Sequence, residues 1–125
     1  PNIDELEAIF ETKINEDNLL DYARKLNELG AENVIVSRGK DGSIFVSDDI
    51  ALKAKPINGK LINSVGAGDS MVAGFVYALK NGKSKEEAYR LAIACGTATA
   101  FSEDIAEREY LYEMLEKVEV REYGN

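Results

Sequence analysis

The sequence contains no histidine and only one cysteine. Without histidine, acid–base chemistry must rest on carboxylates, lysines or tyrosines. Any metal site must use oxygen ligands, which favours magnesium or calcium over zinc. The single cysteine, Cys95, excludes an intrachain disulfide and fits a reducing compartment, so we expect a cytoplasmic protein. Its small apolar neighbours, residues 92–96, are typical of a packed helix face rather than of a reactive thiol.

Long apolar runs are also missing. No stretch approaches the roughly 20 residues that a membrane span requires, and no secretory signal is recognisable. The chain opens on Pro1-Asn2 rather than on methionine and enters a helical pattern almost at once. We therefore expect part of the natural protein to precede Pro1, although a processed or engineered start would look the same.

Positive charge is scarce, and the net charge is −8. An acidic exterior argues against a nucleic acid or an anionic membrane as a partner, because either would favour a basic surface. Only residues 40–85 are locally basic, with seven lysines against four acids. This stretch is also rich in glycine, which favours a phosphorylated ligand there, although lysines on a solvated face would produce the same balance.

The chain has 125 residues, of which 45% are apolar and 30% are charged. That length suits one domain whose hydrophobic core needs no disulfide or metal. The composition is ordinary for a soluble globular protein.

Helical and extended patterns alternate along the sequence, which predicts a layered α/β fold. The apolar spacing predicts helices over 2–11, 16–29, 69–80, 84–101 and 106–117. Strands are expected over 34–36, 43–47, 50–55 and 118–123. The continuous apolar run 34–36 is typical of a strand buried on both faces, as in a parallel sheet. Two helices carry an apolar face, formed by Leu19, Ala23, Leu26 and Leu29 in one and by Val72, Phe75, Val76 and Leu79 in the other.

The segment most suggestive of chemistry is residues 63–70, just before an apolar helix. Gly66, Ala67 and Gly68 leave the backbone uncluttered, and the following helix adds its free N–H groups, so an anion could bind there. Asp69 stands at the edge of this anion hole, where a carboxylate could orient a hydroxyl and accept its proton. The structural alternative is a tight turn with an acidic first helical turn, and spacing alone does not separate the two.

Two other glycine segments are weaker motifs. Gly82-Lys83-Ser84 resembles the end of a P-loop, but Tyr77 stands where that motif needs its first glycine. The loop 37–42 fails the G-x-G-x-x-G spacing of a dinucleotide site. A nucleotide could still lie across it, because a strand followed by a glycine loop is a common ligand-side edge.

At this point a family resemblance becomes clear. Residues 63–75, Asn-Ser-Val-Gly-Ala-Gly-Asp-Ser-Met-Val-Ala-Gly-Phe, resemble the C-terminal signature of the ribokinase-like sugar kinases, also called the phosphofructokinase B family. Three other segments agree in order and spacing: residues 2–5 with an N-x-x-E motif, 34–42 with a strand and S/T-x-G-x-x-G loop, and 91–98 with a small-residue helix beside the nucleotide.

The resemblance covers nearly the whole chain and implies a layered α/β/α, ribokinase-like (Rossmann-like) sheet. It corresponds only to the C-terminal part of such kinases, without the lid. Residues 1–125 are therefore expected to be the C-terminal ATP-binding and catalytic portion of a kinase domain. The di-glycine signature and most sugar contacts of the family belong to an N-terminal portion that this sequence does not contain.

Position by position, the resemblance implies that Asp69 is the catalytic base and that Gly66, Ala67 and Gly68 form the anion hole. It implies ATP and Mg²⁺ as cofactors. Contacts to ATP are expected from Ser37, Arg38, Gly39, Gly42, Gly68 and Thr97. Asn2 and Glu5 are expected to organise the magnesium, although the same pair is a plausible helix start. For residues 91–98, core packing is an equally simple explanation.

The resemblance is closest to the branch that acts on phosphorylated ketohexoses, because Asn63-Ser64 replaces the Asp-Thr that many members carry. The expected reaction converts fructose 1-phosphate to fructose 1,6-bisphosphate. Tagatose 6-phosphate is the second candidate substrate, and an unphosphorylated sugar or a nucleoside is the third. A different class of answer is a catalytically silent nucleotide-binding fragment, because the substrate half is absent.

The partners expected are therefore a sugar phosphate and ATP, with neither nucleic acid nor membrane. A partial parallel sheet would leave an edge and apolar faces exposed. We therefore expect a homo-oligomer or a self-associating chain.

Overall fold

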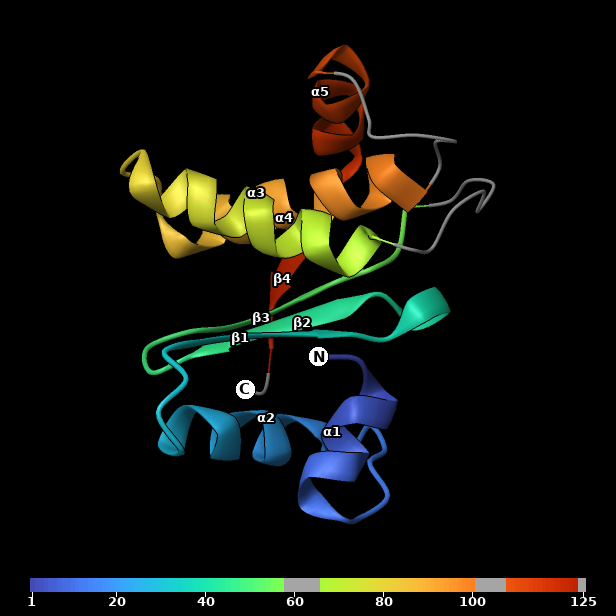
Figure 1. The fold of residues 1–125 in the computed structure, drawn as a ribbon, viewed down its shortest axis with the longest axis vertical. Helices are drawn as coiled ribbons and strands as arrows, with labels where there is room; N and C mark the ends of the chain where they lie inside the picture. The colour runs from blue at the N-terminus through green and yellow to red at the C-terminus, as the bar shows by residue number, and fades with distance from the viewer. Residues whose placement is uncertain (58–65, 101–107, 124–125) are drawn as a thin grey trace. The chain divides into compact units, whose positions relative to one another are not determined.

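The computed structural model describes residues 1–57, 66–100 and 108–123 (Figure 1). The chain divides into two compact units, residues 1–56 with 120–125 and residues 57–119, and each is considered by itself. Among the described residues, no helix combines the length and apolarity needed to cross a membrane.

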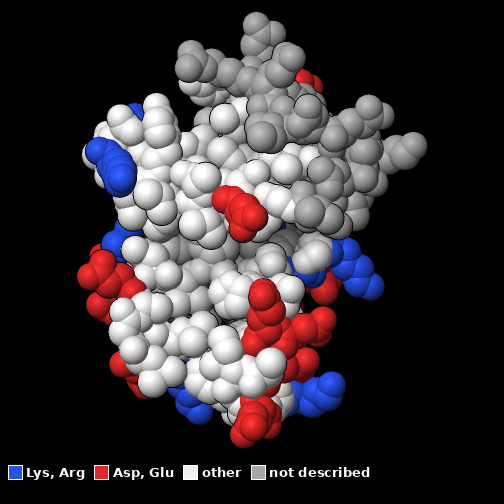
Figure 2. Space-filling model, viewed as in Figure 1, with Lys and Arg blue, Asp and Glu red and all other residues white. Residues whose placement is uncertain are grey.

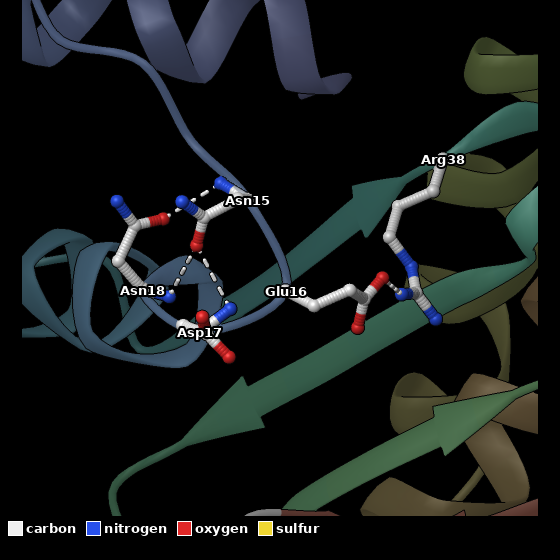
Figure 3. Close-up of polar contacts among 5 residues, drawn as sticks. All are labelled: Asn15, Glu16, Asp17, Asn18 and Arg38. Atoms are coloured by element: carbon white, nitrogen blue, oxygen red, sulfur yellow. Dashed lines mark hydrogen bonds and ion pairs between the residues drawn. The ribbon is translucent and has the colours of Figure 1, made fainter.

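The first unit begins with helix α1, Ile3–Phe10, as the sequence predicts. Asn2 caps it: the Asn2 Oδ1 accepts the Glu5 N–H at 2.8 Å, and the Glu5 Oε1 accepts the Asn2 N–H at 2.9 Å. Helix α2, Leu19–Glu28, starts three residues later than predicted. The preceding residues form a turn instead, in which the Asn15 side chain accepts the N–H groups of Asp17 and Asn18 (Figure 3).

The sheet of this unit has four strands in the order β1-β2-β3-β4. They are β1, Asn33–Ser37; β2, Ser43–Ser47; β3, Ala51–Ala54; and β4, Val120–Glu122. Every neighbouring pair is antiparallel, with Val34 opposite Val46 between β1 and β2. The prediction that residues 34–36 form a parallel strand buried on both faces was wrong for this sheet. The five residues between β1 and β2 are too few for a parallel crossover, and burial alternates along β1.

Helices α1 and α2 lie on one face of the sheet (Figure 1). The core between them contains the fully or almost fully buried Leu6, Leu19, Ala23, Val34, Val36, Ile44 and Val46. Leu29 is not part of it: α2 ends one residue earlier, and Leu29 is 74% exposed. The predicted apolar face of this helix is therefore one residue too long.

The second unit is helical. It contains α3, Ala67–Lys80; α4, Lys85–Ala100; and α5, Arg108–Lys117. Helix α4 opens with the predicted capping box, in which Glu87 N–H donates to Ser84 Oγ at 3.1 Å and Ser84 N–H to Glu87 Oε1 at 3.3 Å. The predicted end of this helix at residue 101 and the predicted start of the last helix at residue 106 lie outside the described part of the chain.

Helices α3 and α4 pack closely because small residues face each other. A Cβ at Gly74 would lie only 2.7 Å from the Cys95 Sγ. Burial raises the pKa of the Cys95 thiol, which agrees with a packed rather than a reactive side chain. The predicted apolar face of α3 was partly wrong: Phe75 is buried, but Val72 and Val76 are 60% and 44% exposed.

The architecture is thus α/β, with helices on a small antiparallel sheet in one unit and a helical second unit. The strand and helix order follows the sequence prediction. The small-residue side of α3, which includes Gly74 and Ala78, is the side that packs.

Candidate functional site

The start of α3 carries the strongest sequence motif, and its backbone is open. Gly66 caps the helix in the left-handed conformation, with φ of 85°, and contributes no side-chain hydrogen bond. The intrahelical hydrogen bond at this end runs from Ser70 N–H to Gly66 O, 2.9 Å. The N–H groups of Ala67 and Gly68 come earlier in the chain. They belong to the first turn, which helix geometry leaves without intrahelical acceptors. Among the described residues, a Cβ at Gly66 or Gly68 would meet no atom within 4 Å, so an anion could approach.

Asp69 occupies the third helical position of α3 and is exposed. Among the described residues, its carboxylate has no hydrogen bond or ion pair. The carboxylate is therefore free to bind a ligand, and it stands beside the positive end of the helix dipole. An unpartnered acid next to backbone donors suits a group that takes a proton while an anion is held nearby.

The predicted ATP loop lies in the other unit. Residues Gly39–Asp41 form a short 3-10 turn, and the loop closes through a 2.8 Å bond from Arg38 N–H to Gly42 O. Gly42 has φ of 89°, and a Cβ there would lie 2.0 Å from the Ala54 carbonyl oxygen. Glycine is thus required at position 42 by the fold. At Gly39 a Cβ would meet nothing within 4 Å, so this corner of the loop is open.

The predicted magnesium pair lies next to this loop. Ser37 N–H donates to the Pro1 carbonyl oxygen at 2.9 Å, and Asn2 forms an isolated parallel bridge with Ser37. Asn2 and Glu5 use one side-chain oxygen each in the capping box. The pair therefore forms the start of helix α1, which was the structural alternative to a magnesium site. The described residues contain no group of three acidic, cysteine or histidine side chains that could enclose a metal.

Arg38 is tied to the connection between α1 and α2. Its side chain is 10% exposed, and its Nη1 donates to the Glu16 Oε1 at 2.5 Å (Figure 3). Its buried Nε has no hydrogen-bond partner in the part of the chain that the structure describes. The guanidinium thus anchors the loop to a turn of the same unit, a structural role that sequence reasoning did not foresee.

Thr97 is half-buried in α4, next to the residue that packs on the start of α3. Sequence reasoning missed Thr99, which is 7% exposed. Its Oγ1 lies 2.8 Å from the Ser70 Oγ, a hydrogen bond in which either oxygen could be the donor. No local pattern marks this pair, because its members are 29 residues apart.

The structure therefore groups the predicted residues in two sets. Gly66, Ala67, Gly68, Asp69 and Thr97 belong to the helical unit. Asn2, Glu5, Ser37, Arg38, Gly39 and Gly42 belong to the sheet unit. Apart from Thr97, the residues of each set are close in sequence or joined by backbone and side-chain hydrogen bonds.

The surface agrees with the acidic composition. On the face drawn in Figure 2, acidic side chains form the larger patches, and basic side chains lie apart from one another. The described part of that face carries no continuous basic patch.

Solved structures share this fold. A crystal structure of a candidate phosphofructokinase from Staphylococcus aureus aligns with a TM-score of 0.92 and 44% identity, over 98% of this chain and 40% of that one. The tetrameric inhibited form of phosphofructokinase-2 from Escherichia coli aligns with a TM-score of 0.82 and 28% identity, over 93% of this chain and 38% of that one. The fold is that of the ribokinase-like sugar kinases.

Sequence comparison defines the family. A model described as pfkB family carbohydrate kinase matches residues 1–107, so the chain belongs to the pfkB family of carbohydrate kinases. It is 43% identical over 121 residues to 1-phosphofructokinase of Bacillus subtilis, covering 96% of the chain. It is 37% identical over 122 residues to D-tagatose-1-phosphate kinase of Bacillus licheniformis, again covering 96% of the chain. The chain spans 40% of the length of each of these relatives.

Proposed function

We propose that the protein containing this chain transfers the γ-phosphoryl group of ATP to a hydroxyl of a ketohexose phosphate. The observation that carries the proposal is the free, exposed carboxylate of Asp69 beside the open backbone donors at the start of α3. Membership of a carbohydrate kinase family supports it. So do relatives whose names specify sugar-phosphate kinases.

In this proposal Asp69 orients the acceptor hydroxyl and takes its proton as the oxygen attacks the γ-phosphorus. The bond between that phosphorus and the β–γ bridging oxygen breaks, and ADP leaves with the electron pair. The N–H groups of Gly66, Ala67 and Gly68 hold the negative charge that develops on the transferred group. Such preorganised donors stabilise the charge without rearranging during the reaction.

Within the sheet unit, we propose that the nucleotide contacts the loop of Ser37, Gly39 and Gly42. The corner at Gly39 supports this, since no described side chain lies within 4 Å of a Cβ placed there. The nucleotide contacts expected from Gly68 and Thr97, in the helical unit, stay predictions. Arg38 also stays a predicted ATP contact. Its side chain is 10% exposed and pairs with Glu16, which holds the loop in place.

Magnesium would reduce the charge on the β- and γ-phosphates. Glu5 is exposed and uses its Oε1 in the capping box, so its second carboxylate oxygen is available to the ion or to a water bound to it. A single protein carboxylate is compatible with magnesium, which keeps several waters and takes its other ligands from substrate phosphates. The ligand role of Asn2 and Glu5 stays a prediction.

For the acceptor, we propose fructose 1-phosphate, which would yield fructose 1,6-bisphosphate. Both curated relatives described above are named for a ketohexose 1-phosphate, fructose in one and tagatose in the other. The second candidate is accordingly tagatose 1-phosphate, in place of the 6-phosphate that the sequence resemblance suggested. The two sugars differ in the orientation of one hydroxyl, so a substrate panel separates them.

Self-association and a cytoplasmic location also stay predictions. An E. coli relative is described as a tetramer in one solved form. The exposed Val72 and Val76 on α3 support an apolar contact surface in this chain.

The test is turnover of the full-length protein with ATP and a panel of sugar phosphates, before and after Asp69→Asn. Loss of a general base should lower kcat by a factor of about 10²–10⁴ with little change in unfolding temperature. Asp4→Asn is the matched control, because Asp4 is also an exposed first-turn acid. It should leave kcat unchanged.

Near-normal turnover in Asp69→Asn would refute the assigned base. If the wild-type protein phosphorylates none of the sugars but binds ATP, the nucleotide-binding alternative is correct.

A further inference from the structure

The first turn of α3 is held from the side that faces α4. Ser70, next to Asp69, is half-buried and shares a 2.8 Å hydrogen bond with the hydroxyl of Thr99. Thr99 is 7% exposed, so this bond is shielded from water. A threonine in a helix can satisfy its hydroxyl on a carbonyl one turn earlier. Here the hydroxyl bonds across to another helix.

Gly96, one turn before Thr99, brings the α4 backbone against the same turn of α3. A Cβ at Gly96 would lie 2.4 Å from the Met71 Cγ and 3.2 Å from the Ala67 carbonyl oxygen. A larger residue would therefore displace the Met71 side chain or the start of α3. The close backbone contact and the Ser70–Thr99 bond together determine where the first turn lies and how it is rotated about its axis.

We infer that Thr99 is a positioning residue for the Asp69 carboxylate and the N–H groups at the start of α3; this inference rests on the proposed function. Successive helix residues are about 100° apart around the axis. With Ser70 turned toward α4, Asp69 is turned aside to the exposed surface. A rotation of the turn would displace both the carboxylate and the donors relative to a bound phosphoryl group.

The alternative is that Thr99 and Ser70 are only two buried hydroxyls that satisfy each other. That alternative predicts a loss of stability when the bond is removed, without a specific loss of turnover. The two explanations therefore differ in how far kcat falls for a given loss in the free energy of unfolding.

The variant that separates them is Thr99→Val in the full-length protein, because valine keeps the shape and removes the hydroxyl. Misplacement of reacting groups by about 1 Å can cost on the order of 100-fold in rate. We expect kcat to fall by between about 10-fold and 100-fold, with the KM values for both substrates little changed. Thr99→Ser, which keeps the hydroxyl, should restore most of the turnover.

Two further variants serve as controls. Ile93→Val removes one buried methylene from the same helix and destabilises it without touching the Ser70 hydroxyl. It should leave kcat unchanged. Ser70→Ala should lower kcat about as much as Thr99→Val, and the double variant should add little, because both remove one bond.

A second measurement does not depend on activity. Amide hydrogen exchange across residues 66–75 should accelerate in Thr99→Val and remain near the wild-type rate in Thr99→Ser and Ile93→Val. An inactive wild-type protein would refute the proposed function, while the exchange rates would still test the anchor. Wild-type turnover in Thr99→Val, or an equal loss in Ile93→Val, would overturn the positioning role.

Discussion

The starts of α1 and α3 have an acid at the same position but differ in how the first turn is capped. Each helix carries an acid at its third position, Glu5 in α1 and Asp69 in α3. In α1 the acid folds back onto the N–H of the cap residue Asn2, whose own side chain takes the N–H of Glu5. In α3 the cap residue is Gly66, which has no side chain, and Asp69 has no partner among the described residues.

The difference shows how one local motif serves two purposes. A helix that satisfies its own first-turn donors gains stability and offers little to a ligand. A helix that leaves the donors and the acid free gives up that stability and can bind an anion beside a proton acceptor. Helix α4, with its Ser84–Glu87 capping box, resembles α1 in this respect.

After the loss of the Asp69 base, the largest expected effect comes from closing the open start of α3. Gly68→Ala places a methyl group where a Cβ now meets nothing within 4 Å. We expect kcat to fall by about 10²–10³, as for the loss of one oxyanion donor, because the methyl group would keep the anion away from the N–H groups. Stability should stay the same or rise by up to about 1 kcal/mol, because alanine is the better helix former. Steady-state kinetics and urea unfolding measure the two quantities.

The control for this change is Asp4→Ala, which places alanine at the same second position of α1. It should leave turnover unaltered. Wild-type turnover in Gly68→Ala would mean that the space beside Gly68 holds no reacting group, and the contrast between the two helix starts would lose its functional meaning.

A smaller effect is expected at the closed start of α1. Asn2→Ala removes the cap that accepts the Glu5 N–H at 2.8 Å, and such caps contribute about 1 kcal/mol. Urea unfolding should register this loss. A magnesium titration of turnover then separates the two roles of the pair. An increase in the magnesium concentration needed for half-maximal rate would support the metal assignment, and a stability change alone would leave only the cap.

The smallest effect is the pH response of the α4 start. The hydrogen bond from Ser84 N–H, and then that from its hydroxyl, lower the pKa of Glu87 below its ordinary value of 4.5. A lowered pKa means that the charged carboxylate stabilises the folded state above pH 4.5. That contribution disappears as the pH falls through the folded-state pKa. Glu87 is exposed, so water screens the interaction and the effect on stability is slight.

An NMR titration of the Glu87 carboxyl group measures this pKa directly. Ser84→Ala should move it only part of the way back toward 4.5, because the backbone donor remains. An unchanged pKa in the variant would show that the hydroxyl contributes nothing. A full return would show that the backbone hydrogen bond depends on the serine side chain.

Much of the fold could be predicted from the sequence because its signals are local. The cap at Asn2, the box at Ser84 and the stop at Gly82 depend on residues within one helical turn, and each appears as expected. The hairpin from β2 to β3 follows from two apolar runs around a short acidic turn. The prediction of a parallel strand at 34–36 was wrong. The sequence contained enough information to avoid this error, because the connection to β2 is too short for a parallel crossover.

The sequence by itself determined the order of the elements, the helix caps and the motif that defines the family, because these depend on neighbouring residues. Only the tertiary structure decided which side of α3 is buried, that Arg38 pairs with Glu16, and that Thr99 reaches Ser70. Those contacts join residues 22 or more positions apart. The packing of whole elements brings them together, and no local preference of the chain encodes them.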